Sequence, residues 1–170
     1  MNRLLLLLMA LALLAAGASW AFNPAYATPP PLLYWGLGVA ELAGLLLLLR
    51  NGTLAGTRYF GGLLACWTLA LAGGLFKIFH YPGADVLLVV GLLGAALLYT
   101  LWFGRKPVKT RLAVLKLLTV LTATLGGLGI LLRWLPRETT YLAHGLFWLT
   151  VFDFVATDYR RLPDAPSPRP

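Results

Sequence analysis

The stretch from Asp85 to Phe103 reads DVLLVVGLLGAALLYTLWF, and its first residue is the only charged one. A helix needs roughly 20 mainly apolar residues to cross the hydrocarbon core of a bilayer. This stretch meets that requirement, so it predicts a transmembrane helix.

Five more stretches of similar length and composition lie between breaks of proline and polar residues. The predicted spans are 4–22, 32–49, 60–79, 85–103, 112–132 and 138–157. They predict an all-α fold, a polytopic transmembrane helix bundle that forms one domain over residues 1–157. The segment 158–170 holds four prolines, and we expect it to be a disordered cytoplasmic tail.

The first span has a second interpretation. Arg3, the apolar run after it and the small residues Ala25-Tyr26-Ala27 also fit a secretory signal peptide. Cleavage there would leave five spans.

The composition of the whole chain supports the membrane class. Of its 170 residues 59% are hydrophobic, the mean hydropathy is +0.79, and 14 basic side chains outnumber 6 acidic ones. So little charge cannot cover a soluble domain of this length, and this hydrophobicity excludes a disordered chain. The net charge of +8 does not indicate nucleic-acid binding, because the basic residues flank the apolar runs.

These basic residues predict the orientation, since lysine and arginine beside transmembrane helices stay on the cytoplasmic side. With Lys77 set aside as intramembrane, one side holds Arg3, Arg50, Arg58, Arg105, Lys106, Lys109, Arg111, Lys116, Arg160, Arg161 and Arg169, and the other only Arg133 and Arg137. We therefore expect a bacterial cytoplasmic (inner) membrane protein with both termini in the cytoplasm. The loops near Pro29, Pro82 and Pro136 should face outward.

The spans pair into hairpins with proline in the outer turn, which suggests a degenerate repeat. Gly91 follows Pro82 by nine residues, as Gly145 follows Pro136.

Small residues recur at every fourth position in two spans. They are Gly36, Ala40 and Gly44 in one, and Gly62, Cys66, Ala70 and Gly74 in the next. Such stripes let helices approach closely in lipid. They predict packing within the chain, with self-association or contact with other membrane subunits as the alternative. Cys66 is the single cysteine, so no disulfide can form within the chain.

Ionisable residues inside a membrane are costly, roughly 2.5–3.5 kcal/mol each on insertion scales. The candidates for a polar or proton-relay cluster are Glu41, Lys77, His80 and His144. Estimated depths place His144 between Lys77 and Glu41, so these three could form a ladder centred on Glu41. Alternatively, Lys77 extends to the headgroups, His144 bonds within the bundle, and Glu41 is neutral and hydrogen-bonded.

Two further ionisable residues fall at equal depth near the inner ends of antiparallel spans. Lys116 and Asp153 are therefore candidates for a structural ion pair.

The sequence lacks the motifs that metal binding, phosphate binding or nucleophilic catalysis would require. Two histidines and one cysteine on different spans do not form a zinc or haem ligand set, and neither a phosphate-binding loop nor a nucleophile elbow is present. We expect no enzymatic activity, no cofactor and no metal.

The segment Gly74–Asp85 reads GLFKIFHYPGAD, with Gly-Leu-Leu at positions 91–93. It resembles the membrane hairpin of the gliding-motility GldL family over about residues 60–104. In that family a Phe-Lys-Ile-x-His element ends one helix and a short Pro-Gly-Ala turn leads into the next. The family belongs to the proton-driven motor of gliding and type 9 secretion.

The resemblance implies that Lys77 and His80 are the polar pair of the first helix. Three residues apart, they should share one helix face. The outer turn would comprise Pro82, Gly83, Ala84 and Asp85. The family's second-helix glutamate is missing, since Gly94 and Ala95 stand there.

The leading hypothesis is a non-enzymatic subunit of a membrane assembly that resembles the GldL hairpin. The alternative is a small proton- or ion-coupled transporter that uses Glu41.

Overall fold

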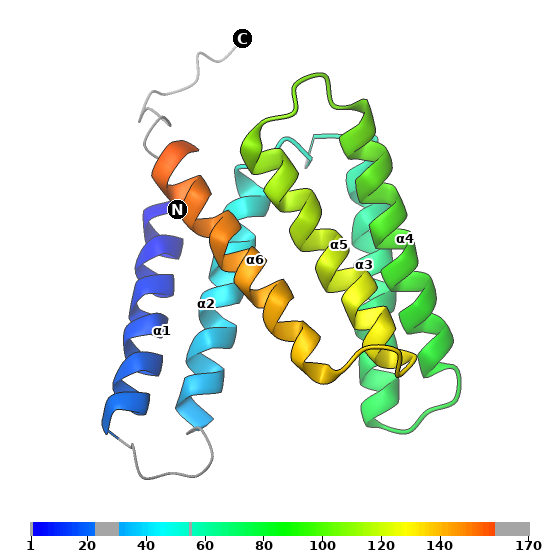
Figure 1. Ribbon diagram of the computed structural model, residues 1–170, viewed down its shortest axis with the longest axis horizontal. Helices are drawn as coiled ribbons and strands as arrows, with labels where there is room; N and C mark the ends of the chain where they lie inside the picture. The colour runs from blue at the N-terminus through cyan, green and yellow to red at the C-terminus, as the bar shows by residue number, and fades with distance from the viewer. Residues whose placement is uncertain (1, 23–30, 55, 159–170) are drawn as a thin grey trace. The chain divides into compact units, whose positions relative to one another are not determined.

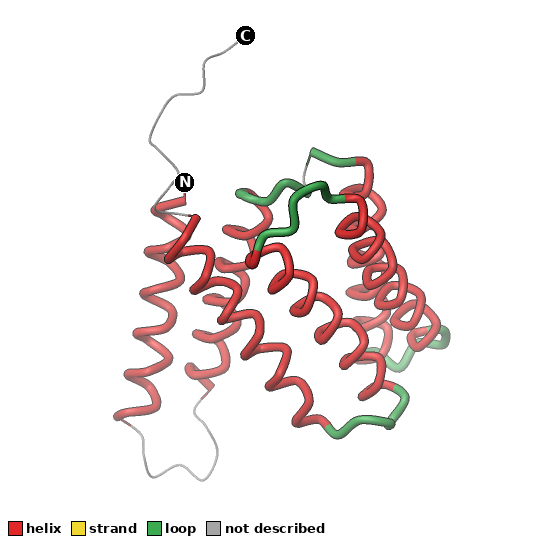
Figure 2. Tube along the Cα trace, turned by 45° about the horizontal axis from the view of Figure 1, so that its top comes forward, coloured by secondary structure: helices red, strands yellow, loops and turns green. Residues whose placement is uncertain are grey.

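The computed structural model describes residues 2–22, 31–54 and 56–158, which are all-α with no strand among them. The chain divides into two compact units, Met1–Ala55 and Gly56–Pro170. The helices are α1 (Asn2–Phe22), α2 (Pro31–Arg50), α3 (Arg58–Ile78), α4 (Ala84–Arg105), α5 (Arg111–Leu131) and α6 (Thr140–Asp153) (Figures 1 and 2). Because the two units are separate, a single domain over 1–157 stays a prediction.

Five of these helices, α1 to α5, are long and apolar enough to cross a membrane. Their ends lie within two residues of the predicted spans. The chain is therefore a multi-pass membrane protein.

The sixth predicted span, 138–157, is more irregular than expected. A single 3₁₀ turn, η1 (Arg137–Thr139), precedes the 14 residues of α6, and a π-helical turn, η2 (Phe154–Asp158), follows them. Asp158, assigned to the tail from the sequence, is the last residue of η2. The rest of that tail, the loop at Pro29 and the Ala25–Ala27 motif lie outside the described residues.

The first unit is a hairpin of α1 and α2 that packs through Gly36. A Cβ at this position would lie 2.8 Å from the carbonyl oxygen of Ala12 and 2.9 Å from the Cβ of Ala16. At the other end of the hairpin, the side-chain amide of Asn2 donates to the Asn51 side chain at 2.9 Å. Only glycine at position 36 permits this close approach.

In the second unit, α3 and α4 pack still more closely. A Cβ at Gly91 would lie 2.6 Å from the backbone nitrogen of Ala70 and 2.7 Å from the carbonyl oxygen of Cys66. A Cβ at Gly94 would lie 2.6 Å from the Cys66 sulfur. The predicted packing of the small-residue stripe within the chain is thus confirmed here.

Several of these small residues face a neighbouring helix of the same chain, and contact of the stripes with other membrane proteins stays a prediction. Gly36 faces α1, Cys66 and Ala70 face α4, and Gly62 meets the Leu98 side chain. Gly74 is the exception, since a Cβ there would meet nothing within 4 Å.

Helices α3 and α5 end in the same way. Tyr81 donates its backbone N–H to the Phe76 carbonyl at 2.8 Å, and His80 donates to the Lys77 carbonyl at 3.3 Å. This pair of bonds is the Schellman motif, and His80 holds its left-handed position with φ 59°. A hydrophobic contact commonly accompanies this motif, and here the rings of Tyr81 and Phe76 make it with their centres 5.5 Å apart.

At the end of α5, Trp134 donates to the Gly129 carbonyl at 2.8 Å and Arg133 to the Ile130 carbonyl at 3.0 Å. Arg133 has φ 60°. Both turns therefore place a residue with a long or aromatic polar side chain, His80 or Arg133, in the left-handed position and an aromatic residue directly after it, which extends the repeat that the sequence suggests. The two hairpins differ at the glycine nine residues after the proline of each turn. Gly91 is packed against α3, whereas a Cβ at Gly145 would meet nothing within 4 Å.

Candidate functional site

Lys77 pairs across the turn between α3 and α4. Its Nζ lies 2.7 Å from Oδ1 of Asp85, and the two side chains are 51% and 69% exposed. Lys77 belongs to the last turn of α3 and Asp85 to the first turn of α4, where each charge is favourable to the dipole of its helix. Asp85, which was expected in the outer turn, lies in the first turn of α4, and its pairing with Lys77 was not predicted.

His80 does not share a helix face with Lys77, so that prediction is wrong. Helix α3 ends at Ile78, and the positive φ of His80 turns the chain away from the helix. The side chain is exposed, with Nδ1 3.0 Å from the carbonyl oxygen of Ile78. Residues Pro82 and Gly83 form the turn as predicted, whereas Ala84 already begins α4.

The ladder of Lys77, His144 and Glu41 stays a prediction. Glu41 lies midway along α2 in the first unit, whereas Lys77 and His144 belong to the second. Within that second unit, His144 lies in the first half of α6 with an exposed side chain.

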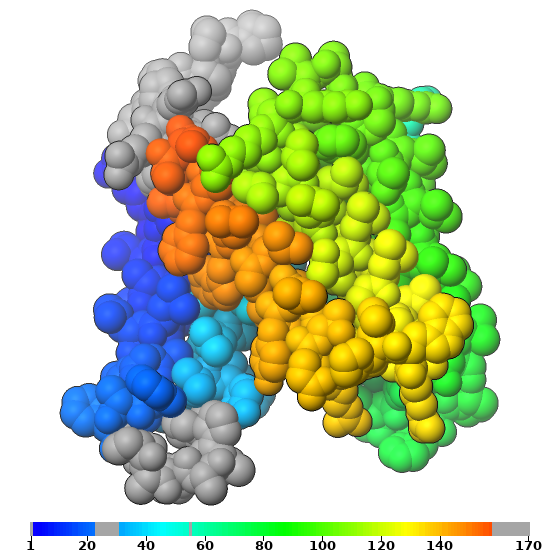
Figure 3. Space-filling model, viewed as in Figure 1, coloured from blue at the N-terminus to red at the C-terminus, as the bar shows by residue number. Residues whose placement is uncertain are grey.

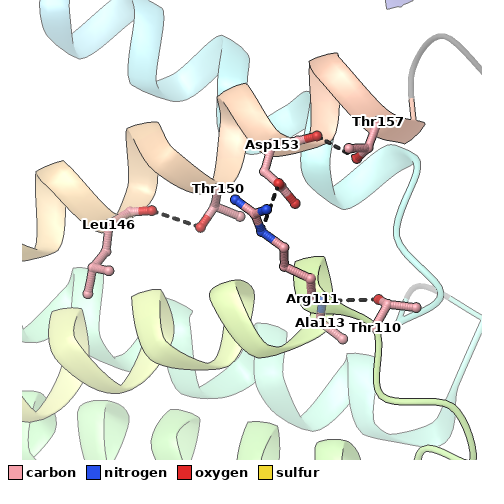
Figure 4. A network of polar contacts seen from close by, with 7 residues as sticks. All are labelled: Thr110, Arg111, Ala113, Leu146, Thr150, Asp153 and Thr157. Carbon is pink, nitrogen blue, oxygen red and sulfur yellow. Dashed lines mark hydrogen bonds and ion pairs between the residues drawn. The ribbon is translucent and has the colours of Figure 1, made fainter.

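A charged contact with one buried partner joins α5 and α6. Asp153, the last residue of α6, has a side chain only 8% exposed, and its Oδ1 lies 3.2 Å from Nε of Arg111. Figure 4 shows the carboxylate and the guanidinium pointing toward each other from the end of one helix and the start of the other. The Arg111 side chain is 77% exposed, so it reaches from the surface to the buried acid.

The predicted pair for Asp153 was Lys116. The structure shows a basic partner on the predicted helix but five positions earlier, at Arg111. The Nζ of Lys116 lies 5.8 Å from the centre of the Phe154 ring. A pair between Lys116 and Asp153 stays a prediction.

A second polar contact in this interface was not predicted. The hydroxyls of Thr119 and Thr150 lie 2.9 Å apart, and Thr150 is 1% exposed. Each hydroxyl also lies within hydrogen-bond distance of the carbonyl oxygen four residues back in its own helix. Since a hydroxyl carries one proton, the hydroxyl that donates across the interface does not donate to its own helix at the same time. Helical spacing could have revealed these residues, since Arg111 and Thr119 are two turns apart on α5, and Thr150 and Asp153 are three apart on α6.

Together these contacts form a polar seam, which we define as Arg111, Thr119, Thr150 and Asp153. Interhelical bonds between polar side chains hold helices together in lipid, where the hydrophobic effect supplies no attraction between them. The geometry therefore fixes the rotation of α6 against α5. Among residues 2–22, 31–54 and 56–158 no group of three His, Cys, Asp or Glu could hold a metal ion.

No protein-family model, no curated protein and no solved structure matches this chain.

Proposed function

We propose that this multi-pass membrane protein is a non-enzymatic subunit of a membrane assembly, built around a GldL-like hairpin and located in a bacterial cytoplasmic membrane. The observation that carries the proposal is the form of α3 and α4. The segment that resembles the family is a closely packed hairpin, in which the Phe76-Lys77-Ile78 element ends the first helix. The turn is held by the Schellman bonds and by the pair of Lys77 with Asp85.

The packing supports a scaffolding role for this hairpin. Gly91 brings the two backbones together, so the two helices pack directly against each other. Helix α3 also presents large apolar side chains at the surface, with Leu71 69% and Ile78 69% exposed. This face is available to lipid and to another membrane protein.

Site-specific photo-crosslinking in living cells tests the proposal. A photoreactive amino acid at Leu71 or Ile78 should give discrete crosslinks to other membrane proteins. The matched control is the same amino acid at Leu63 on the same helix, which is 7% exposed and should give no intermolecular product. If Leu71 and Ile78 crosslink to lipid alone, the subunit proposal is wrong.

Proton flux separates this proposal from the transport alternative. Vesicles containing the parent chain and the Glu41→Gln variant should show the same flux as empty vesicles. A flux that requires Glu41 would instead establish the transporter.

A further inference from the structure

One end of the second unit gathers basic residues from three parts of the chain. Arg58 begins α3, Arg105 ends α4, and Lys106 and Lys109 lie in the linker that leads to α5. We name these four residues the basic rim. Figure 1 shows the start of α3 and the linker from α4 to α5 at the same end of the helices, and Figure 3 shows that linker at the surface.

Aromatic rings hold every cation of the basic rim. The guanidinium carbons of Arg58 and Arg105 lie 5.4 and 5.7 Å from the centre of the Tyr59 ring, and Arg105 also donates a hydrogen bond to the Tyr59 hydroxyl. The Nζ atoms of Lys106 and Lys109 each lie 5.4 Å from a ring centre, that of Trp102 and that of Phe103. Such contacts fix the position of a cation but do not neutralise its charge.

The acidic residues nearest in the chain are engaged elsewhere. Between positions 56 and 111 the sequence has one acidic residue, Asp85, which pairs with Lys77 at the far end of the α3–α4 hairpin. Asp153 pairs with Arg111. The positive charge of the basic rim is thus uncompensated by these carboxylates.

We infer that the basic rim binds the phosphate group of an anionic phospholipid. Helices α3, α4 and α5 are long enough to cross the membrane, so their ends lie at headgroup level, where tyrosine and tryptophan are typically found. Arginine and lysine donate charge-assisted hydrogen bonds to phosphate oxygens. Three of the four cations, Arg58, Arg105 and Lys109, have exposed side chains. A phosphodiester with an apolar tail matches both the cations and the neighbouring lipid-facing helices, whereas a free phosphate matches only the cations.

The inference is independent of the proposed function, since a subunit and a transporter would both leave this surface facing lipid headgroups. It is tested by native mass spectrometry of the full chain, purified in neutral detergent and titrated with phosphatidylglycerol or with phosphatidylcholine of the same acyl chains. The parent should bind phosphatidylglycerol more tightly than phosphatidylcholine.

The decisive variant combines Lys106→Gln with Lys109→Gln, and we expect it to bind phosphatidylglycerol about 30-fold more weakly than the parent. The matched control combines Arg133→Gln with Arg137→Gln, which removes two exposed charges beyond the opposite end of α5 and should leave the affinity unchanged. Replacement of Lys106 and Lys109 by arginine should retain binding, because arginine keeps the positive charge and the donors to phosphate.

Three results would overturn the inference. The first is equal affinity for the two lipids, and the second is an equal loss in the glutamine pair and its control. The third is displacement of phosphatidylglycerol by inorganic phosphate at the concentration of the lipid, which would mean that the site takes the free anion.

Discussion

At the scale of single residues, the structure decides which charges meet. Asp153 has an almost fully buried side chain, and the exposed arginine at the start of α5 reaches it. A buried carboxylate left without its partner costs more than an exposed pair contributes. Arg111 therefore matters more to stability than its own exposure suggests.

We expect Arg111→Gln and Asp153→Asn each to destabilise the protein, with a coupling free energy of about 1 kcal/mol between them. A double-mutant cycle of unfolding in detergent measures this coupling. The control is the same cycle with Lys116→Gln in place of Arg111→Gln. A larger coupling of Asp153 to Lys116 than to Arg111 would show that the sequence-based pair is the correct one.

The left-handed backbone of His80 gives a second prediction at this scale. His80 has φ 59°, a conformation that costs a residue with a Cβ about 1–2 kcal/mol relative to glycine. His80→Gly should raise the free energy of unfolding by about 0.5–1 kcal/mol, because part of that gain is lost to the greater freedom of glycine in the unfolded chain.

The control for this prediction is Phe79→Gly. Phe79 has φ −86°, so glycine there relieves no strain and should lower stability. Thermal unfolding of both variants distinguishes relief of backbone strain from the general destabilising effect of glycine. Destabilisation by His80→Gly would mean that the imidazole contact with Ile78 outweighs the backbone strain.

At the scale of elements, glycine determines how closely helices approach. Gly91 lies against the backbone of α3, and a backbone atom cannot move aside as a flexible side chain can. Gly145, at the corresponding place after the proline of the next outer turn, faces open space. The two hairpins thus share their turns but differ in their packing.

This difference gives a matched pair of substitutions. Gly91→Ala should destabilise the protein by about 1–3 kcal/mol, since the methyl group would overlap Ala70 and Cys66. Gly145→Ala should leave the stability unchanged or slightly higher, because alanine favours the helix. Thermal unfolding in detergent compares them, and equal effects would contradict the packing of α3 against α4.

At the scale of the whole molecule, the basic residues predict which ends of the helices face the cytoplasm. The outer turn at Pro82 and the linker at Val108 lie at opposite ends of α4, and both residues are exposed. The count of basic residues predicts the linker on the cytoplasmic side and the turn outside.

Single cysteines introduced by Pro82→Cys or Val108→Cys, in a Cys66→Ser background, test this orientation. A membrane-impermeant maleimide should label position 82 in intact cells and position 108 only after permeabilisation. The reverse pattern would invert the topology. Labelling of both positions in intact cells would mean that α4 does not span the membrane.

The sequence alone determined the class of protein and the limits of the first five helices. These follow from local properties, because a helix in lipid satisfies its own backbone hydrogen bonds and its apolar length is read directly from the residues. The irregular α6, with its short α-helical part and its π turn, was not predicted, because hydropathy measures the apolar length of a segment and not the hydrogen-bonding pattern of its backbone.

Only the tertiary structure decided which residues meet. Asp153 meets Arg111, Lys77 meets Asp85, and Thr119 meets Thr150 because of how far each helix is rotated and shifted against its neighbour. Rotation and shift depend on side-chain packing between segments distant in sequence, and Gly91 shows how one missing Cβ can set them. Hydropathy carries no information on these contacts, because it treats every face of a helix alike.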